Sequence, residues 1–130
     1  LDSAPTLVHC VNVTDEDIRI IAEHNCPVVT CPRSNRNLRC GVFPWEKFAR
    51  AGVSIALATD SVASARDLDL RSELQACLDQ HGSNLSLPTV LEWLTAGAFR
   101  AMRLPPTLIE PGFSADSLML HDADPQHATS

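Results

Sequence analysis

Short continuous apolar runs alternate along the chain with stretches in which apolar positions follow helical spacing. Three runs lie at 6–11, 27–31 and 53–58, and a fourth lies at 117–120. Continuous apolar runs bounded by turn residues are typical of strands that are buried on both faces, as in parallel sheets. We therefore predict three buried strands in the first half of the chain and one more near its end.

The stretches between these runs predict helices. The stretch after the first run begins with the pattern of a capping box, because Thr14 is followed three residues later by Asp17 at the start of an amphipathic segment. The stretch at 33–41 is polar and predicts a long irregular loop, and long ordered loops often carry function. The predicted helices run from Thr14 to Asn25, from Pro44 to Gly52, over 68–80 and from Ser86 to Met102.

The resulting order is β-α-β-α-β-α-α-β, which places the chain in the α/β class with a parallel sheet. Two architectures fit this order: an open doubly wound sheet, or part of a (β/α)8 barrel. A complete barrel needs roughly 250 residues, whereas this chain has 130. If it is a barrel, it is therefore a fragment with about three of the eight units.

Composition narrows the possible functions. The chain is 45% hydrophobic and 20% charged, as expected of a globular domain, and its net charge of −6 disfavours a nucleic-acid partner. No apolar run reaches the roughly 20 residues that cross a bilayer, and we see no signal peptide. The five cysteines form no C-x-x-C pair, so we expect reduced thiols in a cytoplasmic protein. The first residue is Leu1, which suggests that the chain begins inside a longer protein.

Polar residues follow each of the three predicted strands. His9 ends the first, Ser34 and Asn35 follow the second, and Asp60 ends the third. Functional side chains of parallel sheets gather at the carboxyl ends of the strands. An imidazole and a carboxylate that meet there are suitable ligands for a divalent metal such as zinc.

Each of these residues also has a purely structural interpretation. His9 fits a hydrogen-bonded core histidine, and Asp60 before Ser61 fits a helix or turn cap. Ser34 and Asn35 fit ordinary turn formers. Spacing alone leaves both sets of interpretations open.

Three segments of the chain resemble the amidohydrolase superfamily: LVHCVNVTDEDI, VVTCPRSNRNLRCGVFPWEKFARAGVSIALATDSVAS and DLDLRSEL. The similarity is greatest to the cytosine deaminase/chlorohydrolase-like branch of metal-dependent deaminases, and CPRSN resembles a stretch of aminodeoxyfutalosine deaminases. The resemblance implies that 1–104 are part of a (β/α)8 barrel (strands six to eight with their helices). It further implies that 105–122 return to a small β-sandwich, before a polar tail at 123–130.

The resemblance also implies roles for individual residues. Asp60 matches the aspartate of strand eight that binds the metal and accepts a proton from the attacking water. His9 matches the histidine of strand six that contacts the water or the departing group, and we count it as a second candidate metal ligand. The expected metal is zinc, with iron as the alternative. The residues expected to contact substrate are Arg33, Ser34, Asn35 and Ser64.

The implied activity is hydrolysis of non-peptide carbon–nitrogen bonds, most simply deamination of an amino-substituted heterocycle or a nucleoside-like small molecule. Two departures from the family pattern matter: Ala58 replaces the usual glycine, and the H-x-H pair and the strand-five histidine have no counterpart. We therefore expect the chain alone to be inactive and to need the missing N-terminal half of the barrel or a homo-oligomer partner. The alternative is a non-catalytic half-barrel that folds or assembles only with a complementary chain. An open-sheet nucleotide binder is disfavoured because the chain has no glycine-rich phosphate loop.

Overall fold

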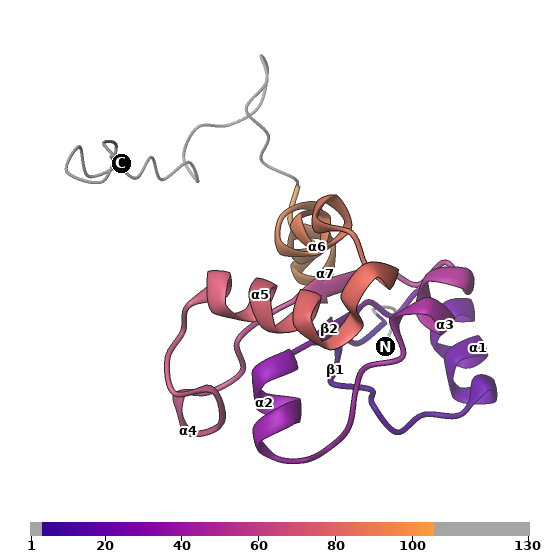
Figure 1. Cartoon of the computed structure of the whole chain (residues 1–130). Helices are drawn as coiled ribbons and strands as arrows, with labels where there is room; N and C mark the ends of the chain where they lie inside the picture. Colours follow the sequence, from indigo (N-terminus) through magenta and orange to yellow (C-terminus); the bar gives the residue numbers. More distant parts are fainter. Residues whose placement is uncertain (1–3, 106–130) are drawn as a thin grey trace.

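The computed structural model describes residues 4–105, which form a small parallel sheet with helices around it (Figure 1). The strands are β1 (Leu7–Val8), β2 (Val28–Thr30) and β3 (Ile55–Leu57), in the order β1-β2-β3. Leu7 pairs with Val28, and Val29 pairs with Ala56. The prediction of an α/β chain with three parallel strands is thus confirmed, whereas the predicted strand at 117–120 and the segments from 106 onward lie outside the described residues.

Helices cover the sheet on several sides. In Figure 1, α1 and α3 lie together beside the sheet, α5 crosses in front of it, and α6 and α7 lie above it. Helices α2 and α4, which follow β2 and β3, lie at the bottom, at the end where the strands terminate. The helices are α1 (Asp15–Glu23), α2 (Pro32–Asn37), α3 (Trp45–Arg50), α4 (Val62–Ala65), α5 (Leu70–His81), α6 (Leu87–Leu94) and α7 (Ala96–Met102), with a 3-10 turn at Gly82–Asn84.

The core lies between the sheet and these helices. Phe48 of α3, Val28 of β2 and Val90 of α6 have no exposed surface. The ring of Phe43 stacks on Phe48 with 4.9 Å between centroids. Burial of each large apolar side chain in this core stabilises the fold by about 1.5–3 kcal/mol.

Local signals in the sequence set the ends of α1. The Thr14 hydroxyl accepts the Asp17 N–H at 3.1 Å, and the Asp17 carboxylate accepts the Thr14 N–H at 2.8 Å, so the predicted capping box is present. The helix ends before Asn25, whose φ of 51° is left-handed and stops the helix, as predicted.

Two predictions from the pattern were wrong. The loop expected at 33–41 begins as the six-residue helix α2. Its polar sequence has no apolar stripe, because its contacts with the rest of the molecule are made by buried polar side chains. The long helix expected from Ser86 to Met102 is broken at Thr95, whose φ of −109° and ψ of −93° are not helical. The break produces α6 and α7, both of which contact β3.

Gly97 explains how α7 approaches the sheet so closely. A Cβ atom at this position would lie 2.2 Å from the carbonyl oxygen of Ile55 in β3. We expect Gly97→Ala to destabilise the complete protein by about 1–3 kcal/mol or more, because either α7 or β3 would have to move. The measurement is the thermal midpoint of unfolding.

Gly52→Ala is the matched control for this prediction. Gly52 has a φ of +74°, but nothing lies within 4 Å of the position that a Cβ atom would take there. That substitution therefore carries only the left-handed backbone cost of about 1 kcal/mol. A larger loss of stability at Gly52 than at Gly97 would contradict the steric argument.

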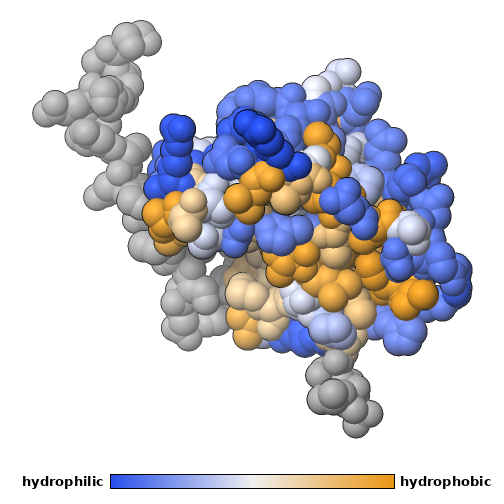
Figure 2. Space-filling model, turned by 90° about the horizontal axis from the view of Figure 1, so that it is seen from below, coloured by the Kyte–Doolittle hydropathy of each residue, from blue (hydrophilic) through white to orange (hydrophobic). Residues whose placement is uncertain are grey.

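The described part of the sheet has two open edges, since β1 and β3 each pair only with β2. Val8 of β1 is 50% exposed, and Leu38 and Val62 at the lower end are also exposed. Figure 2, which views the molecule from below, shows apolar side chains gathered at this surface between hydrophilic ones. Open strand edges and uncovered apolar surface are typical of sites at which further protein packs. Among residues 4–105, no helix is long and apolar enough to cross a membrane.

Candidate functional site

His9 and Asp60 lie side by side at the carboxyl end of the sheet. His9 directly follows β1, and Asp60 lies three residues beyond Leu57, the last residue of β3. The Nε2 atom of His9 is 3.8 Å from Oδ2 of Asp60, and their side chains are 39% and 30% exposed. His9 is therefore not a buried core histidine, and Asp60 is not the helix cap, because the N-cap of α4 is Ser61.

The backbone turns sharply where these two residues leave their strands. His9 has a φ of 70°, Cys10 one of 44° and Asp60 one of 65°. The left-handed region costs roughly 1–2 kcal/mol for a residue other than glycine. These turns direct the imidazole and the carboxylate toward each other across β2.

Two hydroxyl groups hold the Asp60 carboxylate. Ser34 of α2 donates to Oδ2 at 2.6 Å, and Ser64 of α4 donates to the same atom at 3.0 Å. The Ser34 hydrogen bond holds the pKa of Asp60 below its ordinary value, and Ser64 and the nearby His9 add to this effect against the opposing effect of partial burial. Asp60 is therefore a carboxylate at neutral pH, as a metal ligand must be.

Asn35 of α2 holds His9 in the same way. The Asn35 Oδ1 atom lies 2.9 Å from Nδ1 of His9. With Oδ1 placed there, Nδ1 donates the hydrogen bond, and Nε2 is the ring nitrogen that faces Asp60. Asn35 is almost fully buried, and its Nδ2 group has no hydrogen-bond partner among the described residues.

Arg33, which was expected to contact substrate, is buried in an ion-pair network. Its Nε atom donates to Glu73 of α5 at 2.6 Å, and its Nη2 atom donates to the Asp67 carboxylate at 2.7 Å. Sequence reasoning did not identify Glu73, which is fully buried. A signal was present, because Glu73 falls on the inward face of its helix, three residues before Ala76 and four before Cys77, which are both buried.

Cys31 lies at the N-terminus of α2, close to the same carboxylates. Burial raises the pKa of its thiol to about 12, and the negative charges of Asp60 and Glu73 add to the effect. The Cys31 thiol therefore favours its neutral form at physiological pH.

The donors at this site fit a divalent metal in kind but not in number. An imidazole nitrogen and a carboxylate oxygen 3.8 Å apart can bind one ion. Within residues 4–105, however, no group of three or more His, Cys, Asp or Glu side chains could hold a metal. Zinc sites use three or four protein donors. A zinc ion at His9 and Asp60 would therefore need further ligands from outside residues 4–105.

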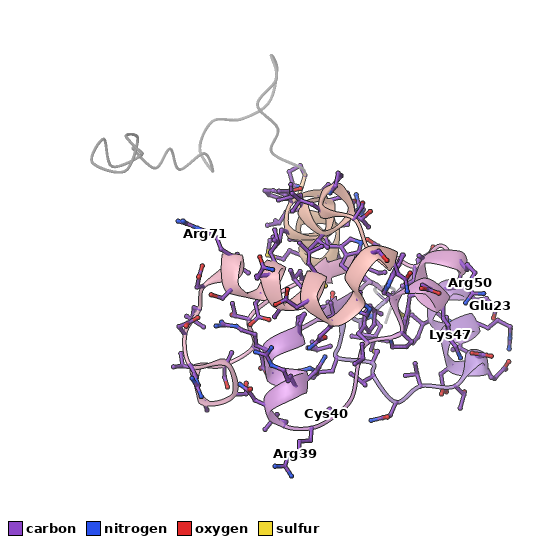
Figure 3. All side chains as sticks on the ribbon, viewed as in Figure 1. Glu23, Arg39, Cys40, Lys47, Arg50 and Arg71 are labelled. Carbon is purple, nitrogen blue, oxygen red and sulfur yellow. The ribbon has the colours of Figure 1, made fainter. Side chains whose placement is uncertain are left out.

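A separate groove of about 490 Å³ lies between α1 and α3, away from this site. Figure 3 shows Glu23, Lys47 and Arg50 at one side of the molecule around this groove, whereas Arg39 and Cys40 lie below α2. Neither His9 nor Asp60 lines the groove. Its lining residues are Asp15, Ile18, Arg19, Ala22, Glu23, Lys47, Arg50 and Ala51.

The sequence of this chain is similar to a known protein family and to known proteins. The model of the amidohydrolase family matches residues 2–129. Aminodeoxyfutalosine deaminase from Deinococcus radiodurans is 58% identical over 74 residues, which are 57% of this chain and 18% of that protein.

Two solved structures are similar in fold and sequence. Aminofutalosine deaminase from Helicobacter pylori, in complex with methylthio-coformycin, aligns with a TM-score of 0.75 and 33% identity over 84% of this chain and 28% of that one. An adenosine deaminase from Xanthomonas campestris with bound zinc aligns with a TM-score of 0.65 and 34% identity over 74% of this chain and 23% of that one. The matched part therefore spans less than a third of the length of each of these proteins.

Proposed function

The chain belongs to the amidohydrolase family, and from that membership we propose that the complete protein is a metal-dependent hydrolase that deaminates a nucleoside-like small molecule. Water and the amino-substituted substrate would give the corresponding carbonyl compound and ammonia. The names of the similar proteins support this reaction, since each is a deaminase of aminodeoxyfutalosine, aminofutalosine or adenosine.

The observation that carries the proposal is the His9–Asp60 pair. Two residues 51 positions apart in the sequence come within 3.8 Å at the end of the sheet where parallel α/β folds carry their active sites. Each of them makes a separate hydrogen bond with α2: the Asn35 Oδ1 atom accepts one from His9, and Ser34 donates one to Asp60. Such fixed side chains are the usual basis of catalysis by positioned groups.

We assign β1, β2 and β3 to strands six, seven and eight of a (β/α)8 barrel, with 1–104 as the barrel portion. The parallel order of the strands, the helices around them and the open edges support this assignment. The other strands would cover the exposed side of β1. The same assignment places 105–122 in a returning β-sandwich segment and 123–130 in a tail.

The roles of the residues follow from chemistry and position. Asp60 and His9 would hold a divalent metal, zinc or alternatively iron, together with ligands from the rest of the protein. When bound, such a metal supplies Lewis-acid chemistry that lowers the pKa of water from about 16 toward 7. The Asp60 carboxylate would take a proton from the attacking water and return it to the departing amino group.

The other site residues would position these groups and the substrate. As the alternative to binding the metal, His9 would use Nε2, the ring nitrogen that Asn35 leaves free, to hydrogen-bond to the attacking water or to the departing group. Ser34 and Ser64 hold Asp60 in place, and Asn35 does the same for His9. We retain Ser34, Asn35, Ser64 and Arg33 as proposed substrate-pocket residues, although the Nε and Nη2 donors of Arg33 are already bound by carboxylates.

Ammonia release by the complete protein tests the proposed function. We expect turnover of aminodeoxyfutalosine or adenosine, with slower or no turnover of free amino-purines, pyrimidines and amino-triazines. Treatment with a metal chelator should remove the activity, and zinc should restore it. Absence of ammonia release from every compound in this panel, with metal bound, would contradict the proposal.

One alternative is that the chain has the barrel fold but no catalytic activity. The chain could be a half-barrel that only assembles with a complementary chain or with a second copy, an option that its open strand edges support. In that case sedimentation would show association while ammonia release stayed absent.

We also propose a cytoplasmic location, which is supported by five cysteines that are all free thiols.

A further inference from the structure

Helix α2 carries Ser34 and Asn35, two of the three residues that hold the site pair, yet it has little stability of its own. It has six residues, its N-cap residue Cys31 makes no side-chain cap hydrogen bond, and Pro32 has no N–H group. Isolated helices of this length are unstable in water. The position of Ser34 and Asn35 must therefore be fixed from outside the helix.

Glu73 of α5 supplies that fixation. Its Oε2 atom accepts the main-chain N–H of Arg33 at 3.0 Å, which is one of the free donors of the first turn of α2. Its Oε1 atom accepts Nε of the Arg33 side chain at 2.6 Å. One buried carboxylate therefore caps α2 and also binds the side chain of a residue in its first turn.

The same network extends to the segment between β3 and α5. Arg33 Nη2 donates to the Asp67 carboxylate at 2.7 Å and to the Asp67 carbonyl oxygen at 3.1 Å. Glu73 has no exposed surface and Arg33 has 8%. Buried carboxylates and guanidinium groups are costly to desolvate unless they are fully paired, so this arrangement strongly specifies one position of α2 relative to α5.

We propose that Glu73, acting through Arg33, is a positioning residue for the reaction. It sets the place of α2, so that Ser34 holds Asp60 and Asn35 holds His9. This inference rests on the proposed function for its kinetic effect, but its structural effect on α2 can be measured independently. Outer residues that orient metal-binding groups typically contribute about 10- to 100-fold to activity.

The variant Glu73→Gln tests this proposal in the complete, metal-loaded protein. The amide keeps the shape of the side chain, but its NH2 group faces a donor of Arg33, so one of the two hydrogen bonds is lost. We expect kcat to fall by about 10- to 100-fold. We also expect the amide hydrogens of 33–38 to exchange at least roughly tenfold faster with solvent, because α2 loses its cap. Arg33→Lys should not preserve function, since an ammonium group cannot reproduce the guanidinium geometry.

A double-mutant cycle separates positioning from a general loss of stability. If Glu73 acts through Ser34 and Asn35, the Glu73→Gln substitution should have little further effect on kcat in a Ser34→Ala/Asn35→Ala background. Val90→Ala in α6 is the matched control, because it opens a cavity at a fully buried position that has no hydrogen bond to α2. It should lower the thermal midpoint but leave kcat and the exchange of 33–38 unchanged.

Two results would overturn the inference. One is a normal kcat for Glu73→Gln with only a lower thermal midpoint. The other is a fold-loss of kcat from Glu73→Gln that is the same in the Ser34→Ala/Asn35→Ala background as in the unmodified protein. If the unmodified protein releases no ammonia, the proposed function fails, but hydrogen exchange in α2 still decides whether Glu73 holds the helix.

Discussion

Asp60→Asn in the complete protein will leave the fold intact and remove nearly all turnover. An asparagine has the same shape, and its amide oxygen can still accept the Ser34 and Ser64 hydroxyls that now bind Oδ2. It lacks the negative charge that attracts a metal ion and the basicity that accepts a proton. Loss of proton transfer alone typically costs about 10²- to 10⁴-fold in rate. The measurements are kcat by ammonia release, bound metal by elemental analysis and the thermal midpoint.

Asp15→Asn is the matched control for this substitution. Asp15 also forms an ion pair, with Lys47 at 2.6 Å, but its side chain is 82% exposed and lies in the groove between α1 and α3. Exposed pairs contribute only about 0–1 kcal/mol to stability, so this variant should retain normal kcat. Near-normal turnover in Asp60→Asn would refute the assignment of Asp60.

The 130-residue chain on its own will show no deaminase activity and will bind zinc weakly. His9 and Asp60 provide two donors, and the described residues offer no cluster of three. Complete zinc sites in small peptides bind the ion with an apparent free energy of about 10–16 kcal/mol. Because this pair has half the donors, we expect at most about half of that binding free energy, which corresponds to a dissociation constant of roughly 1 µM or weaker. Titration of the purified chain with zinc, followed by an assay of ammonia release, provides the measurement.

His9→Ala is a useful comparison in the same experiment. If the pair is the zinc site of the chain, this variant should bind zinc more weakly than the unmodified chain. Catalysis by the isolated chain, free of any complementary fragment, would show that the site does not depend on further ligands.

The sequence predicted that His9 and Asp60 lie close together, because the signal for their placement is local. The apolar runs mark the strands, and the residue that follows each run must lie at the carboxyl end of a parallel sheet. His9, Ser34, Asn35 and Asp60 were identified in this way, and the structure brings all four together as two hydrogen-bonded pairs, with His9 and Asp60 3.8 Å apart. The capping box of α1 was predictable for the same reason, since its two partners are three residues apart.

The parts that were missed depend on distant partners. Helix α2 was predicted to be a loop because its stabilising contacts come from Glu73, which lies 40 residues after Arg33. The break at Thr95 reflects the approach of Gly97 to the backbone of β3, 42 residues earlier in the sequence. Neither contact leaves a periodic pattern at the place where the prediction was wrong, which is 33–41 for the first and Thr95 for the second. Arg33 was assigned to substrate by its neighbourhood, whereas its buried ion pairs are a tertiary feature.

The left-handed turns at His9 and Asp60 have a consequence for the evolution of this protein. Each of the two residues occupies a backbone conformation that glycine adopts at lower energy. Random mutagenesis scored only for heat resistance should therefore favour glycine at both positions, and every such gain would delete a functional group. Stability and function therefore favour different residues at these two turns. In laboratory evolution without selection for activity, we expect His9 and Asp60 to be among the first residues that are replaced.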